Sequence, residues 1–507
     1  MQNDYLKMVL KAPVYDVAKE TPLDPMPSMS QRINNFVSLK REDMQPVFSY
    51  KLRGAYTLMA SLSVTQREQG VITASAGNHA QGVALAAKKL GIKALIVMPK
   101  TTPEIKIASV RQLEAEIILH GNTYDDASEH AHGLAKARQL TYIPPYDHPL
   151  VIAGQGTVGM EIMRQHRGMV DAIFVPVGGG GLIAGVGAYV KEISPETKII
   201  GVEAEESACL KAALDAGERV ILDKVGTFAD GTAVRQVGEE PFRLAQQYVD
   251  EVLVVGIDEI CAAVKDIFED TRSIAEPSGA LALAGIKQWV KRERVENRHL
   301  VAIFSGANVN FDRLRHIAEL AELGEQREAL IAATIPEEPG SFRKFCHALG
   351  PRAITEFNYR YSDNKKAVVF AGIRFKDGNE ERGHLLSELQ QKNFNVEDIT
   401  DNELAKDHIR YMVGGPGGSA GDENNERILR VEFPERPGAL LHFLNLIQDR
   451  WNISLFHYRN HGAAYGKVLM GIQIPPAQEQ AFQAFLSDLE MPFTEERNNP
   501  AYNLFLR

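Results

Sequence analysis

The sequence predicts an α/β protein in which a domain built on parallel sheet is followed by two copies of a smaller α+β domain. Over residues 1–322, continuous apolar strands alternate with helices, which is typical of a parallel sheet covered on both faces. Beyond that point the chain repeats itself once. Its 507 residues also exceed what one hydrophobic core usually holds, so several domains are expected.

The composition excludes several classes of protein. An apolar fraction of 44% and a charged fraction of 24% indicate a folded rather than a disordered chain. A net charge of −10 without a long Lys/Arg run argues against a nucleic-acid-binding surface. Three widely separated cysteines support neither a disulfide framework nor a zinc site. With no basic-then-apolar leader and no run of about 18 apolar residues, we expect a cytoplasmic protein without membrane partners.

The first domain contains at least two strand–helix–strand units. One helix is rich in small residues and is stopped by Gly91, and the other follows a run of four glycines. The strands are expected at 71–75, 94–99, 172–177 and 198–204, with helices at 79–90 and 182–193.

The repeat lies in the last third of the chain. IPEEPGSFRKF at 335–345 corresponds to FPERPGALLHF at 433–443, and ITEFNYRY at 354–361 corresponds to ISLFHYRN at 453–460. Each copy has the element order βαββαβ, which is that of ferredoxin-like folds.

These patterns give the expected domain boundaries. Between the copies, GGPGGSAGDENN at 414–425 has the composition of a linker or exposed loop. We expect one large domain at 1–322 and two smaller domains at 328–402 and 427–499.

The glycine run 178–181 is the first candidate site. It follows a strand and opens a helix at Leu182, where backbone N–H groups can hold a phosphate. Residues 179–184 also match the dinucleotide pattern G-x-G-x-x-G/A, and Glu203 lies about 20 residues on, where a ribose partner is expected. From these residues alone, a nicotinamide-binding domain remains an alternative.

The second candidate is Lys51 in SYKLRGAY. A lone lysine is usually an exposed surface residue. Here Gly54 and Ala55 leave room for a bulky ligand near the backbone, and a pocketed lysine can form a Schiff base and act as a base.

The third candidate is the strand-to-helix turn SAGNH. Ser75, Gly77, Asn78 and the first helical N–H groups can form an anion site of carboxylate size. The alternative is helix capping by Ser75 or Asn78. His79 is either a ligand or a packed, hydrogen-bonded side chain.

The fourth candidate is Ser305 in IFSGANVN, at the end of an apolar strand. The carboxyl ends of strands in α/β sheets face the ligand crevice. The alternative is a polar turn whose Ser and Asn side chains bond their own backbone. AEPSGALAL at 275–283 is explained by Pro277 at a helix start and Ser278 as a local cap.

These four segments, in this order, resemble the pyridoxal-phosphate enzymes of the tryptophan-synthase β fold, and among them the biosynthetic threonine ammonia-lyase family. The resemblance covers essentially the whole chain and implies a two-lobed fold type II catalytic domain with two ACT-like regulatory domains. It also disfavours the dinucleotide interpretation, which explains neither the Lys51 nor the Asn78 segment.

The resemblance implies roles for individual residues. Lys51 matches the lysine that binds pyridoxal phosphate covalently and acts in catalysis, and Asn78 matches the asparagine beside the ring oxygen of the cofactor. The substrate carboxylate is expected at Ser75, Gly77, Asn78 and His79. The phosphate is expected at Gly178, Gly179, Gly180, Gly181 and Leu182. Ser305 matches the residue that bonds the pyridine nitrogen, and no metal ligand is expected.

The implied activity is conversion of L-threonine to 2-oxobutanoate and ammonia in isoleucine biosynthesis, with isoleucine as inhibitor, valine as activator and a homotetrameric assembly. Two positions bear on this. Tyr50 stands where the family usually has phenylalanine, and Ala76 stands where the related serine racemases have an acid/base serine. Elimination without racemisation is therefore expected.

Three alternatives remain. L-Serine differs from L-threonine by one methyl group, so a serine dehydratase or an enzyme that accepts both substrates fits nearly as well. An NAD-dependent oxidoreductase rests on residues 179–203. A non-catalytic amino-acid sensor is disfavoured by Lys51. Glu203 and Asp230 are also considered as a cation site, although isolated acids are more often solvated.

Overall fold

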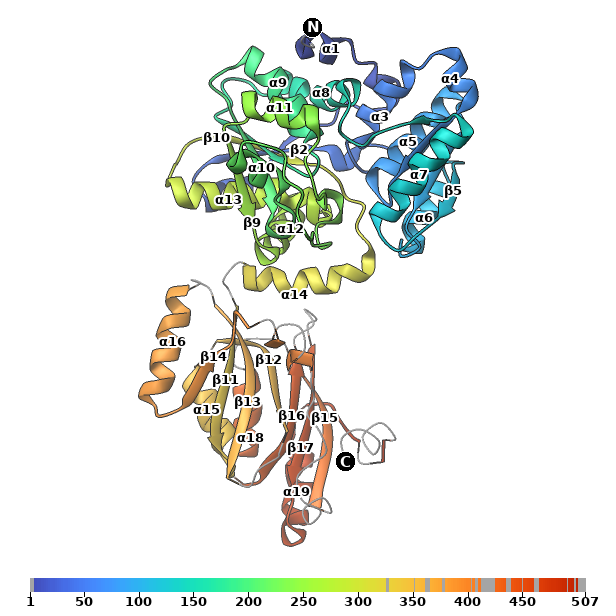
Figure 1. Cartoon of the computed structure of the whole chain (residues 1–507). Helices are drawn as coiled ribbons and strands as arrows, with labels where there is room; N and C mark the ends of the chain where they lie inside the picture. The colour runs from blue at the N-terminus through green and yellow to red at the C-terminus, as the bar shows by residue number, and fades with distance from the viewer. Residues whose placement is uncertain are drawn as a thin grey trace. The chain divides into compact units, whose positions relative to one another are not determined.

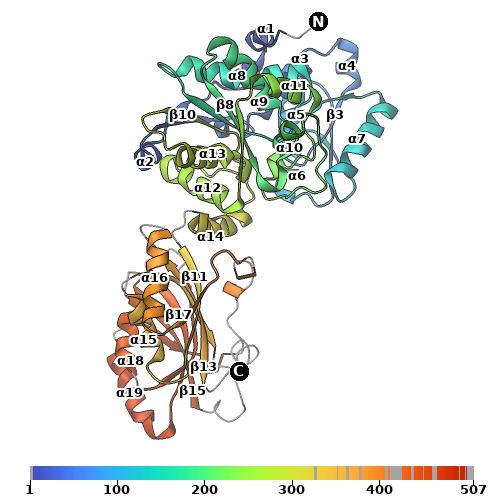
Figure 2. The same ribbon diagram turned by 60° about the vertical axis from the view of Figure 1, so that its left-hand side comes forward.

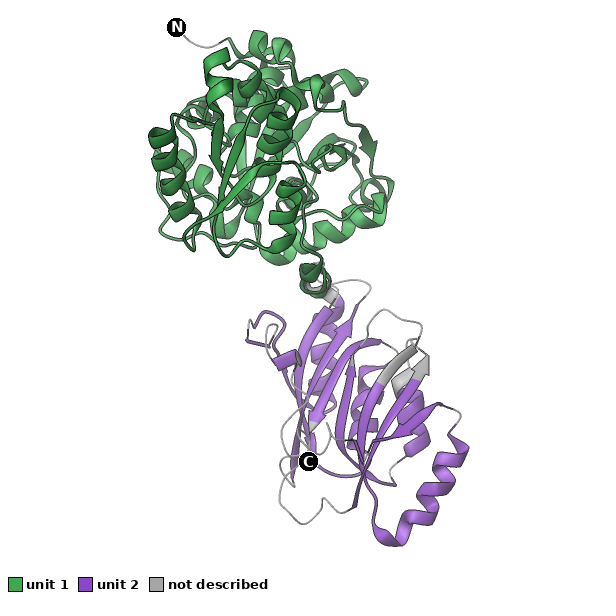
Figure 3. Cartoon of the chain, turned by 90° about the vertical axis from the view of Figure 1, so that its right-hand side faces the viewer, with its two compact units in different colours: residues 1–324 green, residues 325–507 purple. Residues whose placement is uncertain are grey.

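The computed structural model describes residues 4–324, 328–350, 352–360, 365–375, 379–402, 404–405, 409–411, 425–434, 439–448, 450–459, 465–489, 491–496 and 498–499. The chain divides into two compact units, Met1–Gly324 and Glu325–Arg507, coloured green and purple in Figure 3. None of the helices in the described ranges is both long and apolar enough to cross a membrane.

The first unit contains a small four-stranded parallel sheet in the order β5-β4-β3-β6. Its strands are β3 (Val71–Ala74), β4 (Ala94–Met98), β5 (Glu116–Leu119) and β6 (Thr141–Tyr142). Alternate strand residues face opposite layers: Ile96 packs with helices α3 and α5, whereas Leu95 packs with α7. Both faces are therefore covered, as the continuous apolar strands predict.

The same unit contains a larger sheet of six strands in the order β1-β2-β10-β7-β8-β9. All neighbours are parallel except β1 and β2. The strands are β1 (Leu23–Pro25), β2 (Phe36–Arg41), β7 (Ala172–Pro176), β8 (Lys198–Ala204), β9 (Glu251–Val255) and β10 (His299–Phe304). Ile173 packs with helices α8 and α9 on one face, and Phe174 lies edge-on to Trp289 of α13 on the other, with ring centroids 5.8 Å apart.

Figure 1 labels most of the helices that surround these sheets. They are α1 (Tyr5–Lys11), α2 (Pro27–Arg32), α3 (Lys51–Ala60), α4 (Val64–Gln69), α5 (Asn78–Leu90), α6 (Glu104–Arg111), α7 (Tyr124–Arg138), α8 (Pro149–Gln165), α9 (Gly181–Ile193), α10 (Cys209–Ala216), α11 (Glu239–Tyr248), α12 (Ile257–Thr271), α13 (Pro277–Glu293) and α14 (Leu314–Gly324). Short 3₁₀ turns are η1 (Val14–Asp16), η2 (Glu42–Met44), η3 (Glu205–Ser207), η4 (Asp230–Thr232) and η5 (Phe311–Arg313). Gly91 ends α5 in the left-handed region (φ +66°), as its position in the sequence predicts.

The second unit contains both copies of the repeat, each with the predicted order βαββαβ. The first copy consists of β11 (Glu328–Pro336), α15 (Ser341–Leu349), β12 (Ala353–Arg360), β13 (Lys366–Arg374), α16 (Asn379–Gln391) and β14 (Asn395–Asp398). The second consists of β15 (Glu426–Pro434), α18 (Ala439–Ile447), β16 (Asn452–Arg459), β17 (Tyr465–Gln473), α19 (Glu479–Asp488) and β18 (Phe493–Glu495). The described residues of this unit also include the 3₁₀ turns η6 (Ile409–Tyr411) and η8 (Pro476–Gln478). Most of the expected linker, residues 414–424, lies outside the described residues.

The two copies form one continuous eight-stranded sheet, because β12 pairs antiparallel with β16. In this ladder Phe357 faces Tyr458, and Tyr359 faces Phe456. Phe357 and Tyr359 correspond in the repeat to Phe456 and Tyr458, so the two pairs are counterparts of each other, and Asn358 faces its own counterpart, His457. The copies are therefore related by an approximate two-fold axis that passes close to Asn358 and His457.

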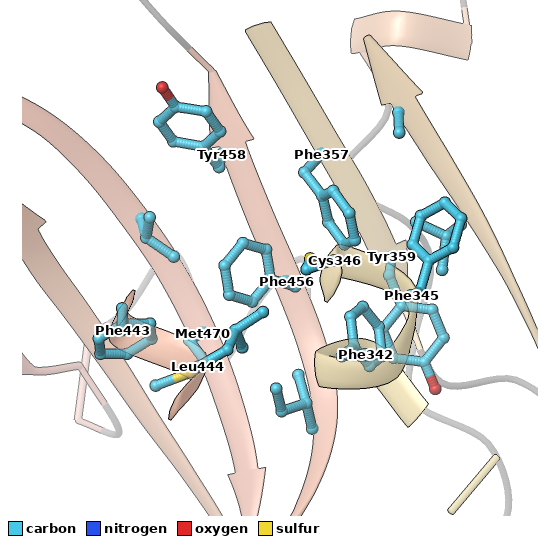
Figure 4. Packing of buried hydrophobic residues seen from close by; sticks show 14 of the residues in the cluster. Phe342, Phe345, Cys346, Phe357, Tyr359, Phe443, Leu444, Phe456, Tyr458 and Met470 are labelled. Atoms are coloured by element: carbon cyan, nitrogen blue, oxygen red, sulfur yellow. The ribbon is translucent and has the colours of Figure 1, made fainter. Parts of the chain in front are cut away.

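One face of this sheet carries the helices of both copies, as Figure 2 shows. The buried aromatic side chains between sheet and helices form one cluster that spans both copies. Phe357 contacts Phe456 across the shared ladder, with ring centroids 5.5 Å apart (Figure 4). The shared core makes the two copies a single folded unit.

Candidate active site

Lys51 is the first residue of α3, and the backbone before it is tied to the end of β10. Ser49 forms an antiparallel bridge with Gly306, and the N–H of Tyr50 donates to the carbonyl oxygen of Ser305 at 3.3 Å. The Lys51 Nζ donates to the carbonyl oxygen of Pro145 at 3.3 Å. Burial lowers the pKa of Lys51 to about 8, although the Glu276 carboxylate acts in the opposite direction. The lysine is thus a half-buried amine that is easily deprotonated.

Tyr50, which stands where the family usually has phenylalanine, packs as an aromatic side chain. Its ring is half-buried against the core of the larger sheet, and the Lys51 Nζ lies 5.3 Å from the ring centre. An aromatic packing role therefore survives at this position.

The turn between β3 and α5 contains the second group of predicted residues. The Ser75 hydroxyl accepts hydrogen bonds from the N–H groups of Gly77 and Ala80, at 3.3 and 3.2 Å. Ser75 therefore stabilises the start of α5, as the capping alternative predicts for it. Asn78 does not cap the helix. Its Nδ2 donates to Glu276 Oε1 at 2.6 Å, and its Oδ1 accepts from Asn308 Nδ2 at 2.6 Å.

His79 is packed rather than open to a substrate. It is 4% exposed, and its Nε2 lies 2.9 Å from the carbonyl oxygen of Ile143, to which it donates. Burial lowers the pKa of His79 to about 3, so the ring is neutral at working pH. As a neutral side chain, His79 cannot supply an acid at neutral pH.

The glycine loop follows β7 and leads into α9, as the sequence predicts. Gly180 has φ +88°, in the left-handed region. A Cβ on Gly179 would lie 2.2 Å from the ring of Tyr146, and one on Gly181 would lie 2.6 Å from Gln155 Oε1. There is therefore no room for a side chain at Gly179 or Gly181. The first N–H groups of α9 have no acceptor within the helix and are available to a ligand.

Ser305 is the residue directly after β10. It is 4% exposed, and its hydroxyl donates to the carbonyl oxygen of Ser278 at 3.4 Å. Ser278 does not cap α13, which corrects the local explanation of AEPSGALAL. Its hydroxyl instead lies 3.3 Å from that of Thr232.

Both oxygens of the Glu203 carboxylate are used in hydrogen bonds within the protein, so this side chain is not the ribose partner that the dinucleotide alternative requires. Its two carboxylate oxygens accept from the N–H groups of Leu210 and Lys211, at 2.9 and 2.8 Å, and so stabilise the start of α10. Burial raises its pKa to about 7. Asp230 forms an ion pair with Lys106 instead. No cluster of three or more His, Cys, Asp or Glu side chains in the described residues could hold a metal ion.

The structure brings the four predicted segments together. Lys51 contacts Pro145, Tyr146 adjoins the glycine loop, Ser305 bonds Tyr50, and Asn78 lies beside the segment after β10. Gln155 Oε1, next to Gly181, is buried and has no hydrogen-bond partner among the described residues. A half-buried amine, a loop of backbone N–H groups at a helix start and a buried hydroxyl fit the aldehyde, phosphate and ring nitrogen of pyridoxal phosphate.

Sequence reasoning missed two residues here. Glu276 is 3% exposed and contacts Asn78, and burial, followed by the Asp230 charge, raises its pKa to about 7. Asn308 bonds Asn78 and the carbonyl oxygen of Val47 rather than its own backbone. Glu276 stands in the AEPSG segment of the sequence. That segment was explained by Pro277 at a helix start and Ser278 as a cap, so no role was assigned to Glu276.

Known proteins resemble this chain over its whole length. The family described as "Pyridoxal-phosphate dependent enzyme" matches residues 14–306, and the "C-terminal regulatory domain of Threonine dehydratase" matches 319–409 and 417–506. The L-threonine dehydratase biosynthetic IlvA of Burkholderia multivorans is 55% identical, with 99% of each chain covered. That of Escherichia coli is 53% identical, over 99% of this chain and 97% of its own.

A solved structure supports the fold of the first unit. The processed form of threonine deaminase isoform 2 from Solanum lycopersicum is 51% identical and superposes with a TM-score of 0.62, covering 62% of this chain and 92% of its own. Together with the geometry around Lys51, these similarities identify the cofactor as pyridoxal phosphate and exclude the dinucleotide alternative for the glycine loop. The chain belongs to the family of pyridoxal-phosphate-dependent biosynthetic threonine dehydratases.

Proposed function

We propose that this chain converts L-threonine to 2-oxobutanoate and ammonia, and that it also accepts L-serine. The observation that carries the proposal is the convergence of the Lys51, Asn78, glycine-loop and Ser305 segments on one buried site. Relatives named as threonine dehydratases share more than half of the sequence.

In this proposal four groups hold the cofactor. Lys51 binds it covalently, the residues from Gly178 to Leu182 bind its phosphate, Ser305 bonds its ring nitrogen and Asn78 bonds its ring oxygen. When bound, pyridoxal phosphate draws electrons away from Cα of the amino acid, which makes the Cα proton acidic.

Lys51 then acts as the base. With a pKa of about 8, about a tenth of its amine is neutral at pH 7, against less than a thousandth for an ordinary lysine, and can accept the Cα proton. Ser305 supplies only a neutral hydroxyl to the ring nitrogen, which favours prompt loss of the β-hydroxyl over storage of negative charge on the ring. Ala76 provides no acid or base on the opposite face, which supports elimination without racemisation.

The substrate carboxylate is proposed at the turn before α5, where Ser75, Gly77, Asn78 and His79 lie. His79 would contribute through the backbone of this turn, since its ring is bonded to Ile143. A methyl group separates threonine from serine and is worth about 1–3 kcal/mol in a fitted pocket, which explains the proposed dual specificity.

The second unit is proposed to bind isoleucine as inhibitor, with valine as an activator. A pocket between the two copies is lined by Gly340 and Phe342 at the start of α15, and by Leu444, Ile447 and Trp451 of the second copy. Its lining also includes the charged residues Glu338 and Arg343, and in this structure it has room for no more than a water molecule, so the proposal rests on the family match of this unit and not on the size of the pocket. The corresponding turn of the second copy, residues 435–438, lies outside the described residues.

The domain boundaries 1–322, 328–402 and 427–499 and the homotetramer are part of the same proposal. So is a cytoplasmic location. Inhibition would then arise from different affinities of isoleucine for two global states of the assembly.

Turnover of L-threonine by the purified full chain tests the proposal. We expect 2-oxobutanoate from L-threonine, pyruvate from L-serine and inhibition of both by isoleucine. A chain that binds pyridoxal phosphate yet forms neither product would disprove the proposed activity.

A further inference from the structure

A chain of hydrogen bonds that begins at the backbone carbonyl oxygen of Val47 and passes through Asn308 orients the Asn78 side-chain amide. Asn308 Nδ2 lies 2.9 Å from the carbonyl oxygen of Val47, four residues before Lys51. A carbonyl oxygen can only accept, so the Asn308 amide must turn its nitrogen toward Val47. The Asn308 side chain therefore has one defined orientation.

That orientation determines the next one. Asn308 Nδ2 donates its second hydrogen to Asn78 Oδ1 at 2.6 Å, so the oxygen of Asn78 must face Asn308. Asn78 Nδ2 then faces Glu276, and donates to Glu276 Oε1 at 2.6 Å. Each bond fixes the direction of the following one.

We propose that Asn308 is a positioning residue of the cofactor site, which fixes the Asn78 amide so that its second N–H remains as a donor for the ring oxygen of pyridoxal phosphate. The inference rests on the proposed role of Asn78. Asn308 acts through Asn78 and does not itself touch the cofactor. Without it, only the bond to Glu276 orients the Asn78 amide, so the amide more often turns over and presents its oxygen, which repels a ring oxygen instead of binding it.

The test is a double-mutant cycle with two readouts that do not require turnover. These are the dissociation constant of pyridoxal phosphate and the position of its visible absorption band in the full-length protein. The variants are Asn308→Ala, Asn78→Ala and the combination. Asn310→Ala is a matched control, because Asn310 lies on the same segment and its Oδ1 accepts from the N–H of Asp312, at 3.3 Å, rather than from Asn78.

We expect Asn308→Ala to weaken cofactor binding up to about tenfold and to shift the band, since one oriented hydrogen bond contributes about this much. In the Asn78→Ala background the same change should add less than about twofold and no further shift. Asn310→Ala should leave both readouts unchanged. If Asn308→Ala does not fold, Asn308→Asp replaces it, because it keeps the side-chain volume and removes the donor.

The outcomes separate this inference from the one on which it rests. Equal losses from the Asn308 change with and without Asn78 would overturn the positioning role and leave that of Asn78 intact. Unchanged binding and spectrum in the Asn308 variants would also overturn it. If Asn78→Ala itself has no effect, the proposed contact of Asn78 with the cofactor fails, and the positioning role fails with it.

Discussion

The side-chain nitrogen of Lys51 lies 3.3 Å from the carbonyl oxygen of Pro145, and this contact links the amine to the glycine loop. The next residue, Tyr146, places its ring where a side chain on Gly179 would stand. Gln155 Nε2 donates to the same Pro145 oxygen at 3.2 Å, which holds the segment against α8. One short segment therefore connects the two ends of the proposed cofactor site.

The first prediction concerns the pH dependence of cofactor capture. Only the neutral amine attacks an aldehyde, and burial lowers the pKa of Lys51 to about 8. The rate at which cofactor-free protein captures pyridoxal phosphate should rise about tenfold from pH 7 to pH 9 and then level off. Stopped-flow absorbance measures this rate, with Nα-acetyl-lysine, whose side-chain amine is free, as the reference. A rate that continues to rise beyond pH 10, as for the reference, would contradict the lowered pKa.

The second prediction concerns the glycine loop. Gly180 has φ +88°, and a Cβ there would lie 2.9 Å from Cβ of Pro241. Gly180→Ala should weaken pyridoxal-phosphate binding at least tenfold, because the loop must shift to relieve both strain and overlap. Gly168→Ala is the matched control: its φ is +103°, but no atom lies within 4 Å of the added Cβ. Equal affinities in the two variants would show that the loop does not bind the cofactor.

The features that the sequence predicts are those formed by residues close together in the chain. The strand expected at 198–204 has those bounds in β8, because a buried parallel strand is a continuous apolar run. The start of α9 after the glycines is likewise a local feature. Such elements can be predicted from neighbouring residues alone.

The interactions that were missed join distant parts of the chain. Asn308 bonds Val47 across 261 positions, and Glu276 meets Asn78 across 198. The pairing of β12 with β16 could not be predicted either, since a repeat defines two similar folds but not which of their edges meet. For Ser278, a local capping rule gave a plausible but wrong explanation.

The third prediction concerns stability. Arg53 forms ion pairs with Glu42 at 2.8 Å and Glu161 at 2.6 Å, and all three side chains are fully buried. Lys40 also contacts Glu161, at 2.6 Å. Arg53→Met leaves two buried carboxylates with one remaining cation, and should lower the free energy of unfolding by about 3–5 kcal/mol.

Chemical denaturation measures this loss, with the fluorescence of Trp289 as the reporter in a Trp451→Phe background. Arg298→Met is the control, because Arg298 is 52% exposed and pairs with Asp171 at the surface, where about 0–1 kcal/mol is expected. A change below about 1 kcal/mol in Arg53→Met would contradict the proposed importance of the buried network.

The fourth prediction concerns regulation. The chain truncated after Gly324 lacks the whole second unit and should turn over L-threonine without inhibition by isoleucine. In the full chain, Asn452→Ala should raise the isoleucine concentration needed for half inhibition, since Asn452 lines the pocket and its Nδ2 donates to Glu337 Oε1 of the other copy at 2.7 Å. Dose–response curves measure both effects. Inhibition of the truncated enzyme at an unchanged concentration would place the effector site in the first unit.

The most direct test of the account is to find which lysine carries pyridoxal phosphate. Borohydride reduces the covalent link between cofactor and lysine, and peptide mass mapping then locates the pyridoxyl group. The account predicts that the label lies on Lys51, and that Lys51→Ala removes both the label and the turnover of L-threonine. A label on any other lysine of the unaltered chain would contradict it.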